Sequence, residues 1–290
     1  MLQSLVDGVC AGLVLALFSS GFGLIYTTTR VFHVSHGALS LLGGYAVWYF
    51  MHSGRTSPIG AIVAALVAIA LSAVAIDLVF YRPLQRLRAP SSVQLITALG
   101  VAIVVENLTA IAFGNEAHVG YEGVAATYTL GGLMLTSAQA IQLTTAALLL
   151  AAFWGTLRWT RAGITVRAVA NDPDLAAVLG VNTEVVRIAA VALGALLGCA
   201  AGVLTYADVG VEPSMAIPML LNGVVGFVLG GGRSLIAPIA GSLFLGIAQA
   251  AVGHLIPGDW SAAVTFGTLV LVVTRSGRGR FTGALAGNRM

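Results

Sequence analysis

The sequence contains no lysine, and only 9% of its 290 residues carry a charge. The stretch LGGGRS at 229–234 therefore cannot be a phosphate-binding P-loop, because that motif, G-x-x-x-x-G-K-[ST], requires a lysine. We interpret the stretch as a tight turn. The chain has only two cysteines, Cys10 and Cys199, and both fall inside apolar runs. The sequence therefore predicts no disulfide framework.

Long apolar runs dominate what is present. Hydrophobic residues make up 58% of the chain, and the mean hydropathy is +0.95. Because a helix rises ~1.5 Å per residue, a run of about 20 apolar residues crosses a bilayer. The sequence predicts an all-α, polytopic membrane protein whose 290 residues form one transmembrane domain (1–290). The nine predicted spans, within a range of eight to ten, are 5–27, 33–51, 60–80, 93–113, 138–157, 188–207, 216–232, 235–253 and 260–274. The seventh is short and glycine-rich, which favours a broken or re-entrant segment.

The arginines are unevenly divided between the two sides that these spans define. Of the 14, only Arg55 falls on one side, and the others fall on the opposite side. Since basic loops stay in the cytoplasm, we expect the N-terminus outside and both the loop at 158–187 and the C-terminus inside. The pI near 9.1 then reflects topology and contact with anionic lipid. The sequence offers no basic surface with interleaved aromatic residues, so we expect no nucleic-acid partner.

The longest polar stretch is TRAGITVRAVANDPDLAAVLGVN, at 160–182. It lies inside the predicted cytoplasmic loop. Its first half has the apolar periodicity of a short helix, with Ile164, Ala168 and Val169 on one face. The sequence therefore predicts a folded loop rather than a flexible connection.

A second short helix is predicted in the same loop. Asp172 suits its N-cap and Pro173 its first turn, while Gly180 suits the position after its end. Asn182 or Thr183 can cap the next span. A helix of about two turns is marginal in water. We keep two interpretations: a loop that rests on the bilayer, and a docking helix for a cytoplasmic partner.

Four stretches of the chain carry motifs that can be compared with known families. They are RVFHVSHGALSLLGGY (30–45), YRPLQRLRAPSSVQLITALGVAIVVENL (81–108), Arg161-Ala-Gly163 with Arg167-Ala168, Asp172 and Ala176-x-x-x-Gly180-Val-Asn182, and VLGGGRSLIAPIAGSLFLGIAQA (228–250). In this order they resemble the LivH-type permeases of branched-chain amino acid ABC importers. The chain departs from the family pattern at His33, Ala38 and Arg233, and in its closing RSGRGRFTG (275–283).

The resemblance implies a permease subunit of the bacterial plasma membrane, not an enzyme, with no cofactor of its own. The implied partners are a second, LivM-like permease subunit, two cytoplasmic ATP-binding subunits and an extracytoplasmic solute-binding protein. The implied solute is a branched-chain amino acid, with urea, short amides and other amino acids as alternatives. The alternative function is a self-sufficient secondary transporter or channel, which usually needs intramembrane charge for ion coupling.

By the same resemblance, the polar stretch is the coupling helix that fits a cleft on the ATPase. Its candidate residues are Arg161, Arg167, Asp172, Leu175, Ala176, Val178, Leu179 and Gly180. The apolar side chains are expected to fill the partner's cleft, and the arginines to orient the two surfaces.

Polar residues inside the predicted spans are candidates for the substrate route, because such groups are costly in lipid. The preferred element is the Pro/Gly-interrupted seventh span around Asn222. Weaker candidates are Tyr26, His36 and Glu106, and for Glu106 a position at the outer interface is an equal alternative. His33 and His36 are one turn apart, which suits a metal, but no third ligand lies near them in sequence. A structural or pathway role is favoured.

Two further patterns predict contacts between helices. Asp77 can reach Arg82, so an ion pair is expected at the cytoplasmic end of the third span. Glycines also recur every fourth residue, which lets helix backbones approach closely. They are Gly8 and Gly12 in the first span, and Gly194, Gly198 and Gly202 in the sixth. We favour a partner helix within this chain over one in a second permease.

Overall fold

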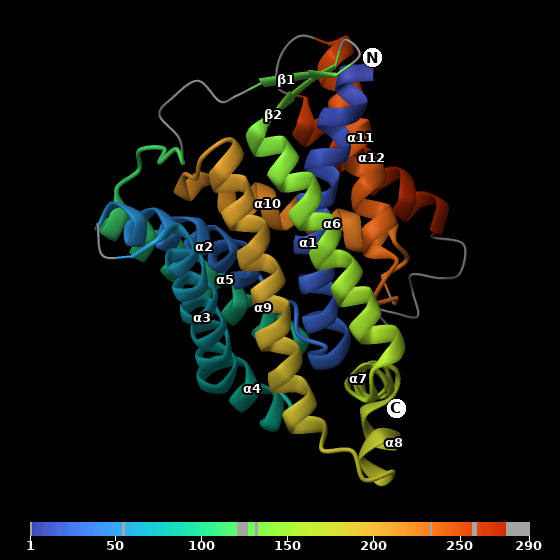
Figure 1. The fold of residues 1–290 in the computed structure, drawn as a ribbon. Helices are drawn as coiled ribbons and strands as arrows, with labels where there is room; N and C mark the ends of the chain where they lie inside the picture. Colours follow the sequence, from blue (N-terminus) through green and yellow to red (C-terminus); the bar gives the residue numbers. More distant parts are fainter. Residues whose placement is uncertain are drawn as a thin grey trace.

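The computed structural model describes residues 2–53, 56–120, 127–130, 133–232, 234–256 and 260–276. Helices dominate this part of the chain (Figure 1). In order, the elements are α1 (Leu2–Thr29), α2 (Ser35–His52), α3 (Pro58–Ile76), η1 (Asp77–Tyr81), α4 (Arg82–Arg86), α5 (Ser91–Phe113), β1 (Thr127–Leu130), β2 (Leu133–Thr136), α6 (Ser137–Trp159), α7 (Arg161–Asn171), α8 (Pro173–Val178), α9 (Thr183–Asp208), η2 (Pro213–Met215), α10 (Ala216–Leu229), α11 (Pro238–Leu255) and α12 (Ser261–Ser276).

The predicted all-α membrane fold is confirmed, and a helix lies in each predicted span. Among the described residues, six helical runs are long and apolar enough to cross a membrane. They are α1, the continuous run α3–η1–α4, α5, α6, α9 and α11. The shorter α10 and α12 and the 18-residue α2 occupy the other three predicted spans.

A two-stranded hairpin between α5 and α6 was not predicted. β1 and β2 pair antiparallel, with Tyr128 opposite Leu135. The sequence TYTL of β1 is rich in the β-branched and aromatic residues that favour strands. Gln3 of α1 hydrogen-bonds the backbone of Met134 twice, at 2.8 and 3.0 Å. These bonds attach the hairpin to the start of α1.

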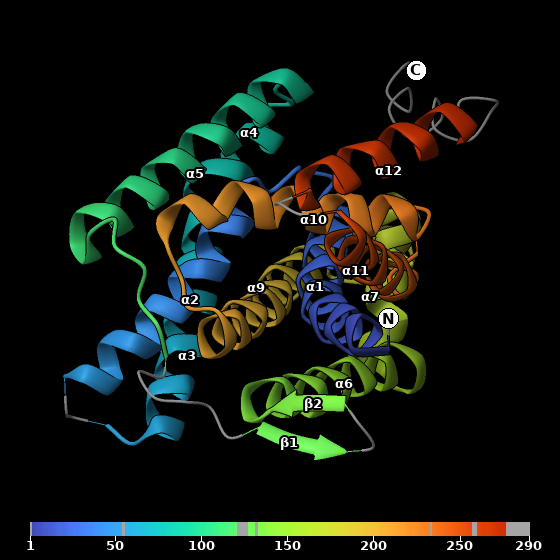
Figure 2. The same cartoon turned by 90° about the horizontal axis from the view of Figure 1, so that it is seen from above.

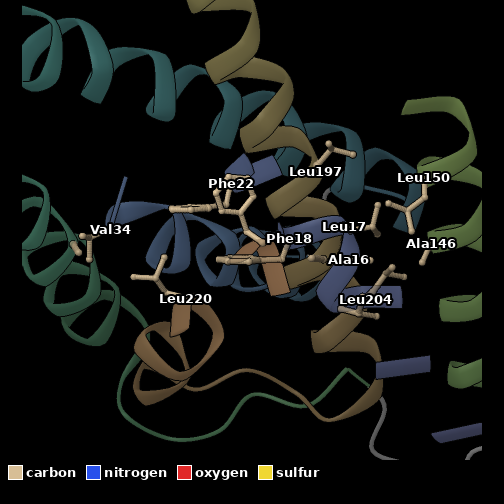
Figure 3. Close-up of a cluster of buried hydrophobic side chains, with 14 of the residues drawn as sticks. Ala16, Leu17, Phe18, Phe22, Val34, Ala146, Leu150, Leu197, Leu204 and Leu220 are labelled. Atoms are coloured by element: carbon tan, nitrogen blue, oxygen red, sulfur yellow. The ribbon is translucent and has the colours of Figure 1, made fainter. Parts of the chain in front are cut away.

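Helix α1 lies at the centre of the bundle, beside α6, α9, α10 and α11 (Figures 1 and 2). Its buried Phe18 and Phe22 belong to one cluster with Leu197 of α9 and Leu220 of α10 (Figure 3). Helices in lipid associate through close packing rather than through the hydrophobic effect. The bundle is therefore organised around the side chains of α1.

The glycine repeats pack against helices of the same chain. A methyl group at Gly12 would lie 3.0 Å from the Cα of Leu243 in α11. A methyl group at Gly202 of α9 would overlap the carbonyl oxygen of Ser40 in α2. The prediction of contacts within the chain is thus confirmed.

A non-helical segment precedes helix α2. Residues 30–34 are not helical, and Arg30 has φ 60°, a left-handed backbone that is uncommon outside glycine. The helix α2 starts only at Ser35, with His36 buried against Phe18 of α1 and Gly198 of α9. Because lipid cannot satisfy free backbone groups, such a break requires surrounding protein.

The expected ion pair between Asp77 and Arg82 is wrong. Asp77 is the first residue of η1, a π-helical turn, and its carboxylate lies 3.7 Å from His33 Nε2. Arg82 instead pairs with Glu184 of α9. The non-helical segment before α2 brings His33 beside Asp77, and the start of α9 brings Glu184 beside α4. Neither neighbour is close in the sequence.

Candidate functional site

The loop at 158–187 folds into the two predicted helices, α7 and α8. The Thr160 side chain caps α7, and Asp172 Oδ1 accepts hydrogen bonds from two backbone amides in the first turn of α8, each 3.0 Å long. Gly180 follows α8 with φ 84°, a conformation that glycine adopts without strain. Asn182 caps α9. Each turn and helix cap in this loop is therefore formed by a residue type that favours that conformation.

Helix α7 is anchored through Gly163, Val166 and Val169, which are buried. A side chain at Gly163 would overlap the backbone of Leu157, so α6 lies directly against this face. The predicted face included Ile164, which is wrong, because Ile164 is 57% exposed. The positions of α6 and α1 determine which face of α7 is buried. That face is rotated by about one residue from the face predicted from the sequence.

Helix α8 presents apolar side chains to its surroundings. Leu175, Val178 and Leu179 are 56%, 83% and 74% exposed, whereas Ala176 is buried at 1%. The helix lies at one end of the molecule, beyond α7 (Figure 1). Exposed apolar patches on a rigid support are typical of interaction sites. Arg161 and Arg167 of the adjoining α7 are also exposed.

Arginine side chains gather at this same end. Arg82 and Arg86 both pair with Glu184, and Arg187 donates a hydrogen bond to Gln85. Hydrogen bonds from the two arginines lower the pKa of Glu184. Arg30 donates to the carbonyl oxygen of Ala170 in α7 at 2.7 Å. Arg55, Arg233 and the C-terminal residues 277–290 lie outside the described part of the chain.

Two candidates for the substrate route, His36 and Tyr26, lie in one aromatic cluster. The His36 ring centroid is 4.6 Å from that of Phe18 and 6.3 Å from that of Phe22. Phe22 in turn stacks on Tyr26, at 6.1 Å and an interplanar angle of 5°. Phe227 of α10 contacts both Phe22 and Tyr26. Phe22 therefore contacts both His36 at the start of α2 and Tyr26 of its own helix.

Glu106 lies on α5, at a narrow cleft of about 10 Å³ between α2, α5 and α10. Val34, Ala38 and Leu220 line the same cleft. That volume barely admits one water molecule. Helix α5 is buried along a single face, at Ala98, Val101, Ala102 and Thr109. Glu106 is half-buried beside that face.

Asn222 lies apart from the other candidates. Its Oδ1 accepts hydrogen bonds from Gln249 of α11 at 3.2 Å and from Thr265 of α12 at 2.6 Å. Gly223, the next residue, contacts Phe18 of α1. Asn222 thus lies on the side of α10 that meets α11 and α12.

Sequence reasoning missed a buried polar cluster beside the break. His33 and Asp77 are 4% and 5% exposed, and Ser35 Oγ lies 2.9 Å from the hydroxyl of Tyr81. The Tyr81 ring also packs edge-on against His33, with centroids 4.3 Å apart. The signal in the sequence was the pair Asp77 and Tyr81, four residues apart on an otherwise apolar helix. Within the described ranges, no three histidine, cysteine or acidic side chains are arranged to hold a metal.

Comparison with known proteins extends over almost the whole chain. Residues 4–273 match the family model described as branched-chain amino acid transport system / permease component. The high-affinity branched-chain amino acid transport system permease protein LivH of Escherichia coli (strain K12) is 26% identical, over 94% of this chain and 92% of its own length. The corresponding protein BraD of Pseudomonas aeruginosa is 24% identical, with the same two coverages.

A solved structure shares the fold. PsaBC from Streptococcus pneumoniae in complex with Fab aligns with a TM-score of 0.53 at 13% identity, over 95% of this chain and 93% of that one. With the match over residues 4–273, these findings show that the chain belongs to the permease components of branched-chain amino acid transport systems, and that it is a membrane-embedded transport subunit rather than an enzyme.

Proposed function

We propose that this chain is a permease subunit of an ABC importer that carries branched-chain amino acids into the cytoplasm. The relatives LivH and BraD, whose names specify this solute class, support the choice of solute. The proposed partners are a second permease subunit, two cytoplasmic ATP-binding subunits and an extracytoplasmic solute-binding protein. ATP is bound and hydrolysed by the partners, since this sequence has no P-loop.

The proposed topology has nine spans in a single transmembrane domain (1–290), with the N-terminus outside and the C-terminus in the cytoplasm of a bacterial cell. The helices that coincide with the nine apolar runs support this number. The positions of Arg82, Arg86 and Arg187 support the orientation, because their contacts place them at the end that carries α7 and α8.

The proposed ATPase contact is made by the loop at 158–187. The observation that carries it is the exposure of Leu175, Val178 and Leu179 on or directly after α8, a helix that packs against α7 and α9. Asp172 and Gly180 shape the ends of α8, and Ala176 packs inward. Movement of α8 would reach the bundle through α7, which α6 and the side chain of Arg30 hold.

The proposed substrate route follows α10 and the break before α2. His36 and Tyr26 contact the aromatic cluster there, and Glu106 lines the cleft between α5 and α10. Asn222 is the candidate on the opposite side of α10. Exposed helix ends and non-helical backbone inside a membrane suit polar solutes, since they offer unpaired donors and acceptors.

Replacing Leu175 by Asp tests the proposal. Burying one such side chain is worth ~1.5–3 kcal/mol, so docking should weaken by about 10- to 100-fold. We expect the purified complex to lose ATPase subunits or solute-stimulated hydrolysis, while the permease stays folded. The measurement is co-purification of the ATPase subunits, together with hydrolysis in the presence of loaded binding protein.

The matched control is Leu87→Asp, because Leu87 follows α4 at the same end and is 79% exposed. It should leave assembly intact. If Leu175→Asp assembles and hydrolyses ATP like the parent, α8 rests on the bilayer and is not a docking helix. Leucine uptake by the permease without any ATPase would favour the alternative, a self-sufficient transporter or channel.

A further inference from the structure

A cavity of about 510 Å³ opens between the end of α1, helix α7 and the turn that joins α10 to α11. Its polar lining includes Arg30, Arg167, Asn171 and Ser234, and its apolar lining includes Leu235 and Ile236. A volume of this size is typical of small-molecule sites. In the proposed orientation, the cavity faces the cytoplasm.

Two guanidinium groups in this cavity have no acidic partner. In the part of the chain that the structure describes, no carboxylate lies within ion-pair distance of Arg30 or Arg167, whereas Glu184 neutralises Arg82 and Arg86. Arg30 uses one nitrogen for the Ala170 carbonyl oxygen, which leaves most of its donors available. Paired guanidinium donors match a carboxylate in geometry as well as in charge.

The backbone at Arg30 is held in an unfavourable conformation. Its φ of 60° is rare for a residue with a side chain, and such residues tend to cluster at functional sites. The conformation is maintained by the Arg30 amide, which donates to Tyr26 O at 2.8 Å, and by Gln85, which donates to Thr29 O at 2.8 Å. It directs the side chain toward α7 and the cavity.

Part of the cavity lining is apolar. Leu157 and Leu235 are buried at 4% and 8% exposure, and Ile236 is partly buried beside them. Asn171 adds an amide oxygen that can accept from an ammonium group. The lining therefore offers donors for a carboxylate, an acceptor for an ammonium and a surface for a branched aliphatic side chain.

We propose that this cavity binds a free branched-chain amino acid on the cytoplasmic side, with its carboxylate on Arg30 and Arg167 and its side chain against Leu235 and Ile236. The proposal rests on the proposed function, since the ligand is the imported solute. A ligand that bridges α1, α7 and the α10–α11 turn stabilises the present position of α7. Occupation therefore slows the cycle and limits further import when the cytoplasmic concentration is high.

The first experiment measures equilibrium binding of radiolabelled L-leucine to the permease–ATPase complex in nanodiscs, without binding protein. L-leucinamide, which lacks the carboxylate, should compete at least ~10-fold less well than L-leucine. Arg30→Gln and Ile236→Trp, which fills the cavity, should each weaken binding by about tenfold or more. Arg158→Gln is the matched control, because it removes an exposed arginine at the same end outside the cavity, and it should bind like the parent.

The second experiment uses proteoliposomes that enclose binding protein and leucine and expose the ATPases to the outer solution. L-leucine added outside should reduce coupled hydrolysis to about a third or less, with L-leucinamide much weaker. Arg30→Gln and Ile236→Trp should raise the half-inhibiting concentration at least ~10-fold.

The outcomes separate the two proposals. The complex could transport leucine and yet neither bind it in the first experiment nor be inhibited by leucine added on the ATPase side. That result overturns the cavity proposal and leaves the proposed transport function intact. Binding that is unchanged in both cavity variants places the ligand elsewhere, which also overturns it. If leucine does not bind but Ile236→Trp releases the ATPase subunits, the cavity holds an ATPase side chain instead. Absence of leucine transport refutes the proposed function, independently of the binding result.

Discussion

Asp77 and His33 illustrate, at the scale of single residues, how burial determines what a charged group does. The two side chains are almost fully buried, and His33 Nε2 lies 3.7 Å from Asp77 Oδ1. His33 Nδ1 lies 3.3 Å from Val31 O, and Nε2 faces the carboxylate of Asp77. The pair fixes the non-helical segment 30–34 to η1.

Removing one member of this pair should be worse than removing both. Asp77→Leu leaves a buried imidazole nitrogen without its partner, and an unsatisfied buried polar group costs ~1–3 kcal/mol. The double variant His33→Leu/Asp77→Leu should recover a large part of that loss. Thermal unfolding of the purified permease in detergent measures both. Equal losses in the single and double variants would show that the two side chains do not interact.

Asn222 has hydrogen-bond partners on α11 and α12, so its role must be separated from theirs. If Asn222 contacts the substrate on its route, Asn222→Leu should lower leucine uptake up to about tenfold. Assembly of the complex and its affinity for the binding protein should be unchanged. Thr265→Val removes one of the same bonds without changing α10, and it should retain uptake. Initial rates in cells expressing equal amounts of each variant provide the measurement. Equal loss in the two variants would assign Asn222 to helix packing.

At the scale of elements, the helices of this bundle differ in how closely their backbones approach their neighbours. Gly198 and Gly202 of α9 meet His36 and Ser40 of α2, so the helix after the break lies directly on α9. Helix α5, in contrast, is buried along one narrow face. Close approach thus occurs between α2 and α9, as it does between α1 and α11, and not along α5 at Gly100.

Two glycine substitutions should therefore have opposite effects. Gly202→Ala places a methyl group against the Ser40 carbonyl oxygen, and overpacking of this kind costs ~1–3 kcal/mol or more. Gly100→Ala on α5 meets no heavy atom within 4 Å, and it should stabilise the helix by up to ~1 kcal/mol. Unfolding temperature and the yield of monodisperse protein measure the difference. A Gly202→Ala variant as stable as the parent would contradict the packing described for α2 and α9.

At the scale of the whole molecule, charge separates the two ends. Arg82, Arg86 and Arg187 lie with the coupling loop, whereas Glu116 and Glu212 lie beside the bridge that pairs His118 with Val211. In the proposed orientation the arginine-rich end is cytoplasmic. The same orientation directs α8 toward the ATPases.

Cysteine labelling in intact cells tests this orientation. An impermeant thiol reagent should label Glu116→Cys from outside and leave Asn171→Cys unmodified until the membrane is permeabilised. The native Cys10 and Cys199 are 2% and 0% exposed, so they should not react in either case. The reverse pattern of labelling would invert the topology and remove α8 from the cytoplasm.

The sequence by itself determined the features that depend on neighbours along the chain. Apolar run length placed the helices, and Asp172, Gly180 and Asn182 predicted the two ends of α8 and the start of α9. These predictions are confirmed because helix formation and capping involve residues within about four positions of one another.

Only the tertiary structure decided the partners of the polar groups. Asp77 pairs with His33 instead of Arg82, Asn222 binds Gln249 and Thr265, and Ile164 is exposed. Each of these depends on which helices become neighbours and on the break at residues 30–34. Hydropathy does not encode that arrangement, because every helix in lipid has an apolar surface and only close backbone approach and buried polar pairs distinguish one neighbour from another.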